Sequence, residues 1–501
     1  MTSTKLKLSV MMFLQYFIWG SWFVTMGTYL GTTLGFSGAQ IGLAYGATAI
    51  AALLTPFLMG TIADRFFPSE KMLAVLHLGG AGLIYAVSLQ TDWSTFYPLL
   101  IVYALFYMPT LALTNSISFE NIPSAEKDFP LIRVFGTLGW IAAGWVVGLV
   151  LRAGPDSILY PSVTSLFGTD AALLRPNSFF FMAAGASALL GLFCFALPHT
   201  PPKRKSGSAS SGQRKSILNL LRERSFLVFV VSSFLICIPL AFYYNLANVF
   251  LQQTDAPSPT ALQTVGQISE VGFMALMPVF IAWLGVKRLL AIGMLAWVLR
   301  YLFFGSLMFP LVFVGLLLHG VCYDFFFVGS QIYVDSKADL SQRASAQSFI
   351  AFVTLGVAMF VGALLAGFTM DSYPPQIQVT AIDAKQSEKV VPLPDWDPQG
   401  KTGLAAALNL GPNDTIRPED LPEEFVDSQT ELRYRKHHLA AALKKADRNS
   451  DGVVDRAEWR AAQAHDWFHI WLWPAVAAGA TLAFFWLGFK DDTTRQAAQA
   501  S

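Results

Sequence analysis

The stretch FLVFVVSSFLICIPLAFYYNLANVFL fills residues 226–251 and carries no charged side chain. About 20 apolar residues in an α-helix cross the hydrocarbon core of a bilayer, so this stretch predicts a membrane-spanning helix. Eleven further runs of comparable length predict eleven more spans. The twelve runs lie near 8–32, 39–62, 71–90, 95–118, 130–152, 177–197, 226–251, 262–284, 288–308, 310–333, 345–369 and 467–489.

The composition of the whole chain also indicates a protein embedded in lipid. Of its 501 residues 54% are hydrophobic and only 13% are charged, against about 25% charged residues in soluble proteins. Lys and Arg (34) nearly balance Asp and Glu (33), which leaves no basic surface for nucleic acid. We therefore predict an all-α polytopic membrane protein whose partner is the lipid bilayer, and we exclude nucleic-acid binding.

The positive charges predict the orientation, since Lys and Arg are retained on the cytoplasmic side of a membrane. An even number of spans places both termini on one side. The segments on that side carry many Lys and Arg residues, whereas the short loops on the other side carry only Arg152 and Arg175. We therefore expect both termini to be cytoplasmic.

Five regions follow from this pattern. Residues 1–198 form an N-terminal six-helix half, and a polar, basic linker at 199–224 joins it to helices seven to eleven at 225–370. Residues 371–465 form a polar insertion that is expected on the extracytoplasmic side. Helix twelve and a C-terminal tail occupy 466–501.

Ionisable residues at membrane depth are costly and usually face a cavity or a partner, which makes them candidates for function. Asp324 lies near the middle of run ten between apolar neighbours. Its carboxylate must pair across the bundle or hold a proton, and a group that alternates between these two states suits proton coupling. A structural ion pair between two helices is the alternative.

Gln267 and Glu270 lie three residues apart in run eight and share one helix face. An amide and a carboxylate on one face can bind a polar solute. Polar residues also hold helices together in membranes, and helix packing is therefore the alternative for this pair.

Two arginines also lie in or beside apolar runs. Arg133 opens run five with Thr137 one turn later, and its position fits either a pocket or a salt bridge with Asp128 or Glu120. Arg300 is expected to extend to the membrane surface or to pair structurally, so we leave it out of the site.

A calcium loop is predicted inside the insertion, where residues 447–458 read DRNSDGVVDRAE. This pattern matches the EF-hand loop at each ligand position and has glycine at the sharp turn. A polar turn without metal is the alternative. The ligand oxygens are expected from the side chains of Asp447, Asn449, Asp451, Asp455 and Glu458 and from the carbonyl of Val453.

The surroundings of this loop carry two further expectations. EF-hands usually pair through the residue at loop position eight. Residues 409–420 have the same spacing as an EF-hand loop, but most of the ligand residues are missing. We therefore predict a metal-free partner loop in which Ile416 lies opposite Val454. An irregular linker is the alternative, because the segment contains two prolines. No glycine or proline separates Glu458 from Pro474, so the exit helix of the hand is expected to continue into helix twelve.

Several motifs resemble those of known transporters. Gly60-x-x-x-Asp64-Arg65 resembles the loop signature of the major facilitator superfamily, whose members have twelve helices in two six-helix halves. The segments at 13–22, 107–111, 128–137, 266–270 and 323–326 closely resemble the bacterial nucleoside:proton symporter family. The resemblance covers all twelve helices but not 371–465, and the EF-hand insertion is foreign to the family members we recognise.

The resemblance implies the major facilitator fold and proton-driven uptake of nucleosides by alternating access, with the site between the two halves. Two positions depart from the family. The seventh helix of family members often offers an amide side chain to the solute, but Ala241 is apolar here, and either Tyr244 or Asn245 replaces the missing amide. His319 occupies a position that is aromatic in the family. Purine or pyrimidine preference therefore stays open. Family pocket positions fall on Arg133, Thr137, Gln267, Glu270 and Asp324. From the residues themselves, Tyr323 beside Asp324 is a candidate stacking partner for a flat ring, and Asp324 and Glu270 are the candidate proton carriers.

We therefore predict a monomeric importer of nucleosides and protons in the bacterial cytoplasmic membrane. The sequence has no Walker A loop and no catalytic Ser/His/Asp or Cys/His arrangement, so we expect neither an ATP-driven pump nor an enzyme. Transport needs no cofactor, and calcium is expected at the EF-hand-like loop alone. The alternatives are a facilitator or symporter of another polar solute such as a sugar, and a calcium-sensing membrane receptor.

Overall fold

A computed structural model describes most of the chain. It covers residues 3–58, 68–123, 125–151, 175–201, 220–254, 256–338, 343–383, 386–394, 404, 408, 414–427 and 432–490. The loop signature at 60–65, most of the predicted linker and the first residues of the predicted partner loop lie outside the described residues.

The first half of the membrane part follows the first six apolar runs. Each helix is apolar around most of its circumference, as expected where one side packs on other helices and another side faces lipid. The elements are α1 (Ser3–Thr28) with the π-turn η1 (Tyr29–Thr33), α2 (Gly38–Leu58), α4 (Ser69–Ser88), α5 (Trp93–Glu120), α6 (Ala125–Trp145) with the π-turn η3 (Val146–Leu151), and α8 (Ser178–Phe193) with the 3₁₀ turn η5 (Cys194–Ala196).

The second half follows the last six runs. Gly285 has a φ of 68°, a left-handed conformation that favours glycine, and it divides the long helix α11 into two segments that match runs eight and nine. The elements are α10 (Arg224–Gln253), α11 (Pro259–Gly305), α12 (Phe309–Leu317), α13 (His319–Tyr323), the π-turn η6 (Asp324–Val328), α14 (Gly329–Lys337), α15 (Arg343–Ala351), the π-turn η7 (Phe352–Ala358), α16 (Met359–Ser372) and α20 (Trp467–Gly488).

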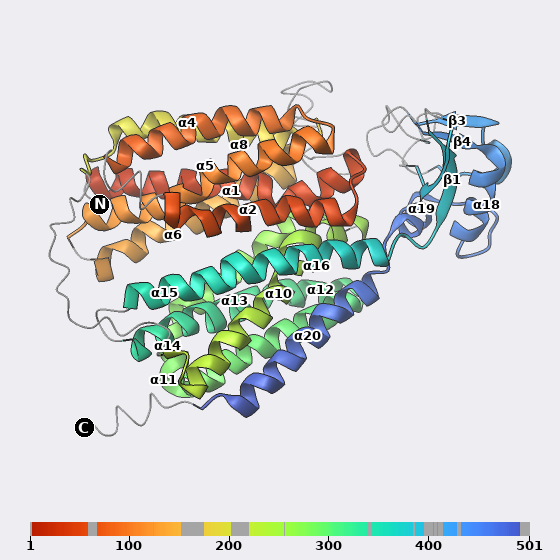
Figure 1. The fold of residues 1–501 in the computed structure, drawn as a ribbon. Coiled ribbons are helices and arrows are strands. Elements are labelled where there is room, and N and C mark those ends of the chain that lie inside the picture. Colours follow the sequence, from red (N-terminus) through yellow and green to blue (C-terminus); the bar gives the residue numbers. More distant parts are fainter. Residues whose placement is uncertain are drawn as a thin grey trace.

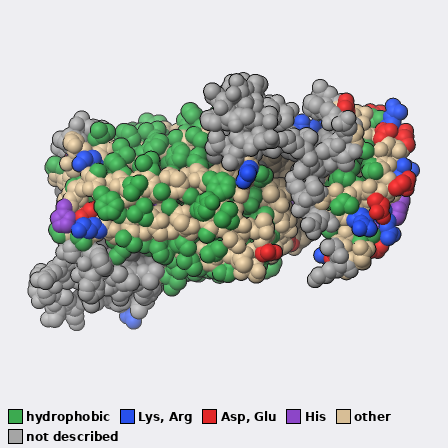
Figure 2. Space-filling view, turned by 90° about the horizontal axis from the view of Figure 1, so that it is seen from above, with side chains coloured by type: hydrophobic (Ala, Val, Ile, Leu, Met, Phe, Trp, Pro, Cys, Tyr) green, Lys and Arg blue, Asp and Glu red, His purple; other side chains and the backbone are tan. Residues whose placement is uncertain are grey.

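In the part of the chain that the structure describes, ten helices are long and apolar enough to cross a membrane, and α2 contributes a shorter apolar helix. The predicted number of twelve spans stays a prediction. Figure 2 shows hydrophobic side chains over much of the bundle surface, with charged side chains gathered on the insertion and at the opposite end. Exposed apolar residues such as Val75, Leu131 and Trp283 are explained by contact with lipid tails.

The two halves lie side by side with their helices roughly parallel to one long direction (Figure 1). The start of α1 and the end of α20 lie at one end of this bundle, here called the terminal end, and the insertion lies at the other, here called the insertion end. The pairs α1 with α10, α2 with α16 and α6 with α11 join the halves.

Contacts near the insertion end hold the halves close together. Asp371 of α16 accepts hydrogen bonds from the backbone N–H groups of Gly38 and Ala39 at 2.6 and 2.7 Å, which places a carboxylate at the N-terminus of α2. A Cβ atom at Gly42 would collide with the carbonyl of Ala363. Thr28 donates to Asn248 across the same boundary at 2.7 Å.

The insertion has a folded core of its own. Its strands β1 (Gln378–Ile382), β2 (Glu388–Pro392), β3 (Glu424–Val426) and β4 (Arg433–Arg435) form an antiparallel sheet in the order β2-β1-β4-β3. The turn η8 (Pro418–Asp420) and the helices α18 (Lys436–Ala446) and α19 (Arg456–Gln463) complete it. Leu439, Leu443 and Trp459 are buried in this core. The sheet was not predicted, because strands of three to five polar-rich residues leave little periodic signal.

The predicted continuation of the EF-hand exit helix into the last membrane helix is wrong. Helix α19 ends at Gln463, and Ala464 is extended with a ψ of 139°. Asp466 then caps α20 by accepting from the backbone N–H of His469, so a new helix begins where a cap is available.

A single side chain anchors this break to the membrane part. The Oε1 atom of Gln253, at the end of α10, accepts hydrogen bonds from the backbone N–H of His465 at 3.1 Å and from Trp467 Nε1 at 2.9 Å. Burial lowers the pKa of His465 to about 4, so this histidine is neutral at neutral pH. The insertion is therefore tied directly to α10.

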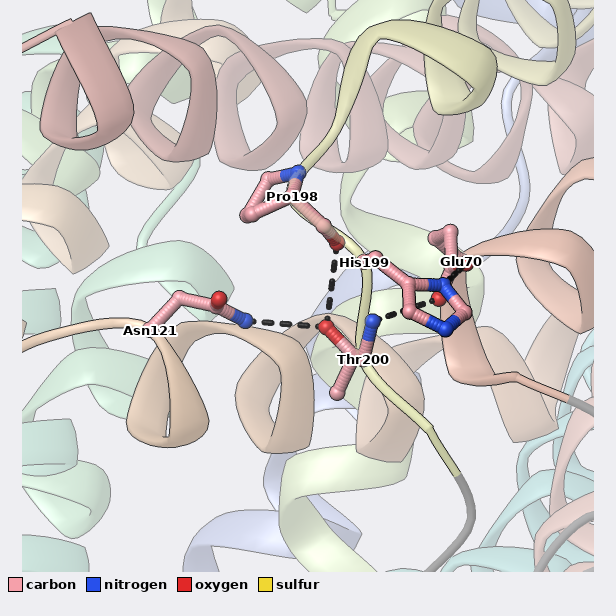
Figure 3. Close-up of polar contacts among 5 residues, drawn as sticks. All are labelled: Glu70, Asn121, Pro198, His199 and Thr200. Atoms are coloured by element: carbon pink, nitrogen blue, oxygen red, sulfur yellow. Dashed lines mark hydrogen bonds and ion pairs between the residues drawn. The ribbon is translucent and has the colours of Figure 1, made fainter.

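The end of the first half is tied to its own helices (Figure 3). Glu70 of α4 accepts from the backbone N–H of Thr200 at 3.0 Å and lies 2.8 Å from His199 Nδ1. Asn121, at the end of α5, donates to Thr200 Oγ1 at 2.9 Å. The first half therefore extends at least to residue 200, two residues beyond the predicted boundary.

Candidate functional site

A cavity lies between the two halves, and in this conformation its free volume is about 20 Å³, which is room for about one water molecule. Helices α1 and α6 line it from the first half, and α10 and α11 line it from the second. Its walls are formed by Val24, Trp140, Gly144, Tyr243, Tyr244, Thr260, Gln263, Thr264 and Gln267.

One polar stripe runs along α11 beside this cavity. Thr260, Gln263 and Gln267 follow each other at three- and four-residue spacing, which places them on one helix face. Asn248 of α10 donates to Gln263 Oε1 at 2.8 Å, whereas the buried Oε1 atom of Gln267 has no hydrogen-bond donor among the described residues. Gln267 is therefore an open acceptor at the cavity wall.

Asp324 is fully buried and begins the π-turn η6. Neither of its carboxylate oxygens has a hydrogen-bond partner in the described part of the chain. Single π-turns within helices often occur at functional sites, because they turn one side chain out of the regular helical pattern. The alternative of a structural ion pair at Asp324 receives no support from these contacts.

Glu270 lies one helical turn beyond Gln267 and connects the two halves electrostatically. Its Oε2 atom is 3.8 Å from Nε2 of His319, which belongs to the second half. It also interacts with the charge of Arg133, which belongs to α6 of the first half. Asp324 is close enough to interact with Glu270 as well.

Arg133 faces the bundle interior and stacks on an aromatic ring. Its guanidinium carbon lies 4.1 Å from the centre of the Tyr16 ring. A Cβ atom at Gly136 would lie 2.7 Å from both side chains, so glycine leaves room for this stacking. Asp128, which was one predicted salt-bridge partner of Arg133, pairs with Lys5 at 2.6 Å.

Aromatic rings form a second type of surface in the cavity. Trp140 packs edge-on against Trp19 at 5.7 Å between ring centres, and Tyr244 packs edge-on against Phe23 at 5.9 Å. Offset and edge contacts of this kind hold flat side chains in place and leave their free faces for another ring.

The structure separates the two predicted substitutes for the missing amide. Tyr244 lines the cavity. Asn245 is buried against α16 instead, where its Nδ2 lies 3.4 Å from the carbonyl of Ala363. Thr137 is half-buried on α6 and is not among the lining residues.

Tyr323 and His319 pack next to each other on the second half. Their ring centres lie 5.7 Å apart, and Tyr323 also packs on Phe327 at 4.7 Å. The ring of His319 packs on Tyr243 at 5.3 Å, which connects it to the cavity wall.

The expectation that Arg300 extends to the membrane surface is wrong. Arg300 is fully buried, with its guanidinium carbon 3.5 Å from the centre of the Tyr243 ring. Its Nη1 atom donates to Nδ1 of His319 at 3.0 Å. Sequence reasoning also missed Tyr243, Thr260, Gln263 and Thr264. The spacing of Thr260, Gln263 and Gln267 could have revealed the stripe.

The predicted calcium loop lies between α18 and α19 of the insertion. Ile416 and Val454 form an antiparallel bridge with two hydrogen bonds of 2.9 Å, which confirms the predicted pairing of these residues. Gly452 has a φ of 85°, which suits glycine at a sharp turn. Glu458 Oε1 accepts from the backbone N–H of Arg448 at 3.0 Å.

The other proposed ligands accept backbone hydrogen bonds within the loop. Asp447 and Asn449 accept from Asp451 N–H at 3.2 and 2.9 Å, and Asp455 accepts from Glu458 N–H at 2.8 Å. Across the described residues, no three His, Cys, Asp or Glu side chains are gathered closely enough to hold a metal ion.

Comparisons with known proteins agree with one another. The family described as "Nucleoside H+ symporter" matches residues 2–381, and this match ends within β1 of the insertion. The chain is 45% identical over 379 residues to "Putative nucleoside transporter YegT" of Escherichia coli (strain K12), covering 74% of this chain and 85% of that protein. It is 33% identical over 392 residues to "Xanthosine permease" of the same organism, covering 74% and 89%. The solved structure of the nucleoside transporter NupG matches with a TM-score of 0.67 at 23% identity, over 97% of this chain and 99% of that chain.

Proposed function

Because this chain belongs to the nucleoside H⁺ symporter family, we propose that it imports nucleosides together with protons across the cytoplasmic membrane of a bacterium. The predicted major facilitator fold is confirmed by the structural match. Transporters with this fold work by moving two halves around a site between them. The observation that carries the proposal is the cavity between the halves, with the open acceptor of Gln267 in its wall.

The walls of the cavity offer both kinds of contact that a nucleoside requires, and the two halves must move apart to admit one, because the free volume of about 20 Å³ holds only about one water molecule. Trp140, Tyr243 and Tyr244 provide aromatic surface for a flat base. Gln267 Oε1 can accept a hydrogen bond from an amino, imino or hydroxyl group. Since a buried acceptor without a donor costs free energy, a solute that supplies the donor binds more tightly than one that does not.

We propose Asp324 and Glu270 as the proton carriers. An ionised carboxylate without a partner is strongly disfavoured in a low-dielectric interior, so each group must hold a proton or face a cation. Arg133 is a cation that acts on Glu270 from the other half. A cycle in which protonation and pairing with a cation alternate would couple proton movement to the exchange between conformations.

The contacts between the halves support a state that is closed at the insertion end. Trp145 of α6 donates to Thr264 of α11 at 2.9 Å, in addition to the Thr28–Asn248 and Asp371–α2 contacts. With the termini in the cytoplasm, as the positive charges predict, the insertion end faces outside. The state described here would then be closed to the outside.

Two further features of the importer belong to the proposal. We keep the monomer as the working unit, because the proposed site lies between the two halves of one chain. Transport requires binding and proton transfer without bond formation in the solute, which supports a protein that is not an enzyme and needs no cofactor for transport.

Uptake by purified protein in proteoliposomes tests the function. With an inward-directed proton gradient, wild type should accumulate at least one member of a panel of uridine, cytidine, adenosine, guanosine and inosine. Accumulation should collapse when the gradient is removed. Uptake of a labelled sugar without uptake of any nucleoside would support the alternative of another polar solute, and no uptake of either would support a receptor.

Carboxylate variants test the coupling step. Asp324→Asn and Glu270→Gln keep the side-chain volume but no longer change protonation, so we expect the double variant to lose accumulation. Glu223→Gln is the matched control, because Glu223 is half-exposed and pairs with Lys337 at 3.3 Å away from the cavity. Accumulation at the wild-type level by the double variant would rule out both residues as carriers.

We also propose that the loop at 447–458 binds calcium. The donor set fits this ion, because Ca²⁺ takes six to eight oxygen ligands and the loop supplies carboxylate, amide and carbonyl oxygens. The Ile416–Val454 bridge supports the proposal, since it joins the loop to a second segment as in paired EF-hands. The bound ion would supply charge to the loop and hold α18 and α19 at a constant angle.

Calcium titration of the full-length protein by calorimetry tests this site. We expect one site with a Kd on the order of 10⁻⁴ to 10⁻³ M, as in extracellular modules. Glu458→Gln should remove the heat of binding. Glu419→Gln, in the partner segment, should not change it. A second equivalent site would contradict the metal-free partner loop, and no heat at millimolar calcium would contradict the calcium site.

A further inference from the structure

Arg300 is the most unusual charged residue in the membrane part. It is fully buried in the second half, and two of its nitrogen atoms, Nε and Nη2, have no hydrogen-bond partner among the described residues. No carboxylate oxygen of the described chain lies within 4.0 Å of it. Its guanidinium group lies on the face of Tyr243, which offsets part of the cost of burial.

One hydrogen bond of Arg300 determines which ring nitrogen of a histidine carries the proton. A guanidinium group has only donors, and its Nη1 lies 3.0 Å from Nδ1 of His319. His319 Nδ1 must therefore accept and cannot carry a proton. In the neutral ring the proton then resides on Nε2, which makes this atom a donor.

The Nε2 atom of His319 faces the carboxylate of Glu270. The two atoms Nε2 and Oε2 lie 3.8 Å apart, slightly too far for a hydrogen bond and close enough to form one after a small movement. Glu270 therefore lies between a donor of its own half and the cation Arg133 of the other half.

The backbone around His319 holds this arrangement in place. A Cβ atom at Gly266 would lie 2.9 Å from Cβ of His319, and one at Gly320 would lie 2.6 Å from the backbone of Ser269. Ser269 Oγ donates to the carbonyl of Leu317 at 2.8 Å and accepts from the N–H of Gly320 at 2.9 Å. The segment that carries His319 thus packs closely on the segment of α11 that carries Glu270.

We propose that Arg300 is a positioning residue for the solute site: it holds His319 in the tautomer whose Nε2–H retains the Glu270 carboxylate on the second half. This inference rests on the proposed function. Without the relay Arg300–His319–Glu270, the carboxylate is free to move toward Arg133. A Glu270 carboxylate that pairs with Arg133 no longer accepts a hydrogen bond from a solute bound between the halves, so solute affinity falls while both proton carriers remain.

Uptake kinetics of the full-length protein in proteoliposomes test the relay. The probe is the nucleoside of the panel that wild type accumulates most. Arg300→Met removes the donor and keeps an apolar stem, and we expect it to raise KM about tenfold, the equivalent of about 1.4 kcal/mol. His319→Phe keeps a ring against Tyr243 and Tyr323 but removes both nitrogens, and it should raise KM by a similar factor.

Two further variants separate positioning from packing. Arg300→Lys keeps a group that can only donate, so its KM should lie much nearer to the wild-type value. Arg300→Met combined with His319→Phe should be no worse than either single change, because both break the same relay. Tyr301→Phe is the matched control on α11: it loses the hydrogen bond from the Tyr301 hydroxyl to the carbonyl of Pro239 and should keep the wild-type KM.

The outcomes separate this inference from the function on which it rests. A wild-type KM in His319→Phe, additive effects in the double variant, or an equal rise in KM in Tyr301→Phe would overturn the relay while nucleoside uptake stands. Failure of wild type to take up any nucleoside would instead overturn the proposed function. If Arg300→Met does not fold, the comparison of His319→Phe with Tyr301→Phe still decides.

Discussion

Each half of the bundle contains a buried polar cluster, and the two clusters differ in how fully they are hydrogen-bonded. In the first half, Gln15 donates to Thr110 at 2.7 Å and lies 2.9 Å from Nε2 of His77, whose Nδ1 lies 3.1 Å from Ser187. Each side-chain polar atom of Gln15 and His77 thus has a partner. This cluster connects α1, α4, α5 and α8 and is complete as it stands.

The cluster of the second half is incomplete. Gln267, Arg300 and Asp324 together leave five buried polar atoms without partners among the described residues. Each such atom costs roughly 1–3 kcal/mol. The difference between the clusters teaches that the polar atoms of Gln15 and His77 are used to join helices, whereas five polar atoms of Gln267, Arg300 and Asp324 are not.

The largest effect that would sharpen this comparison is expected in the first half. His77→Phe fills the space of the imidazole but leaves Gln15 Oε1 without a partner, while Ser187 Oγ still donates to the backbone carbonyl of residue 77. We expect a loss of about 1–3 kcal/mol of stability from the unpartnered oxygen. Thermal unfolding in detergent measures it, and solute affinity of the folded variant should not change. A lowered affinity would show that the first cluster also serves the solute.

A change of opposite sign is expected in the second half. Asp324→Leu replaces an unpartnered buried carboxyl by an apolar group of similar size, and we expect a gain of about 1–3 kcal/mol in stability together with loss of accumulation. The same unfolding assay measures the first effect and uptake the second. A loss of stability would show that Asp324 has a structural partner, and the comparison between the halves would fail.

An effect on binding alone is expected at the cavity wall. Gln267→Ala removes the open acceptor, and we expect nucleoside affinity to fall by about 1–2 kcal/mol with little change in unfolding temperature. Calorimetric titration with the transported nucleoside measures the dissociation constant. Gln263→Ala is the comparison variant, because Gln263 is already bonded to Asn248. An unchanged Kd for Gln267→Ala would assign that residue to helix packing.

The smallest effect is expected at the junction between the membrane part and the insertion. Because burial lowers the pKa of His465 from 6.5 to about 4, the folded state disfavours its protonated form. The stability that this neutral histidine contributes is complete above pH 6.5 and is lost as the pH falls toward 4. Limited proteolysis near residues 463–467 should therefore accelerate over that range, and His465→Gln should flatten the response.

Much of the fold could be predicted from single runs of sequence. Helices form wherever about 20 apolar residues follow one another, because backbone groups in lipid must bond within their own segment. Gln267, Glu270 and Asp324 were identifiable because a polar side chain stands out in such a run. The pairing of Ile416 with Val454 was equally accessible, since the spacing of the EF-hand loop determines which residues meet.

The rest of the site could not be predicted in this way. Nothing in the neighbourhood of Arg300 in the sequence indicates that Tyr243, which lies in another helix, covers its guanidinium group. The choice between Tyr244 and Asn245 depended on the rotation of α10, and the structure turns Asn245 toward α16. The break between α19 and α20 arose from a cap at Asp466 and an anchor at Gln253, which are separated by more than 200 residues.

The sequence by itself determined that the chain is a bundle of membrane helices with a polar insertion, and it determined which polar residues lie at membrane depth. These properties depend on hydrophobicity and periodicity, which are local along the chain. The tertiary structure alone decided which of those polar groups are satisfied and which stay open. That distinction depends on distances of about 3 Å between atoms on different helices, the range in which a hydrogen bond forms. For this reason only the packed structure distinguishes the complete cluster around His77 from the open cluster around Gln267, Arg300 and Asp324.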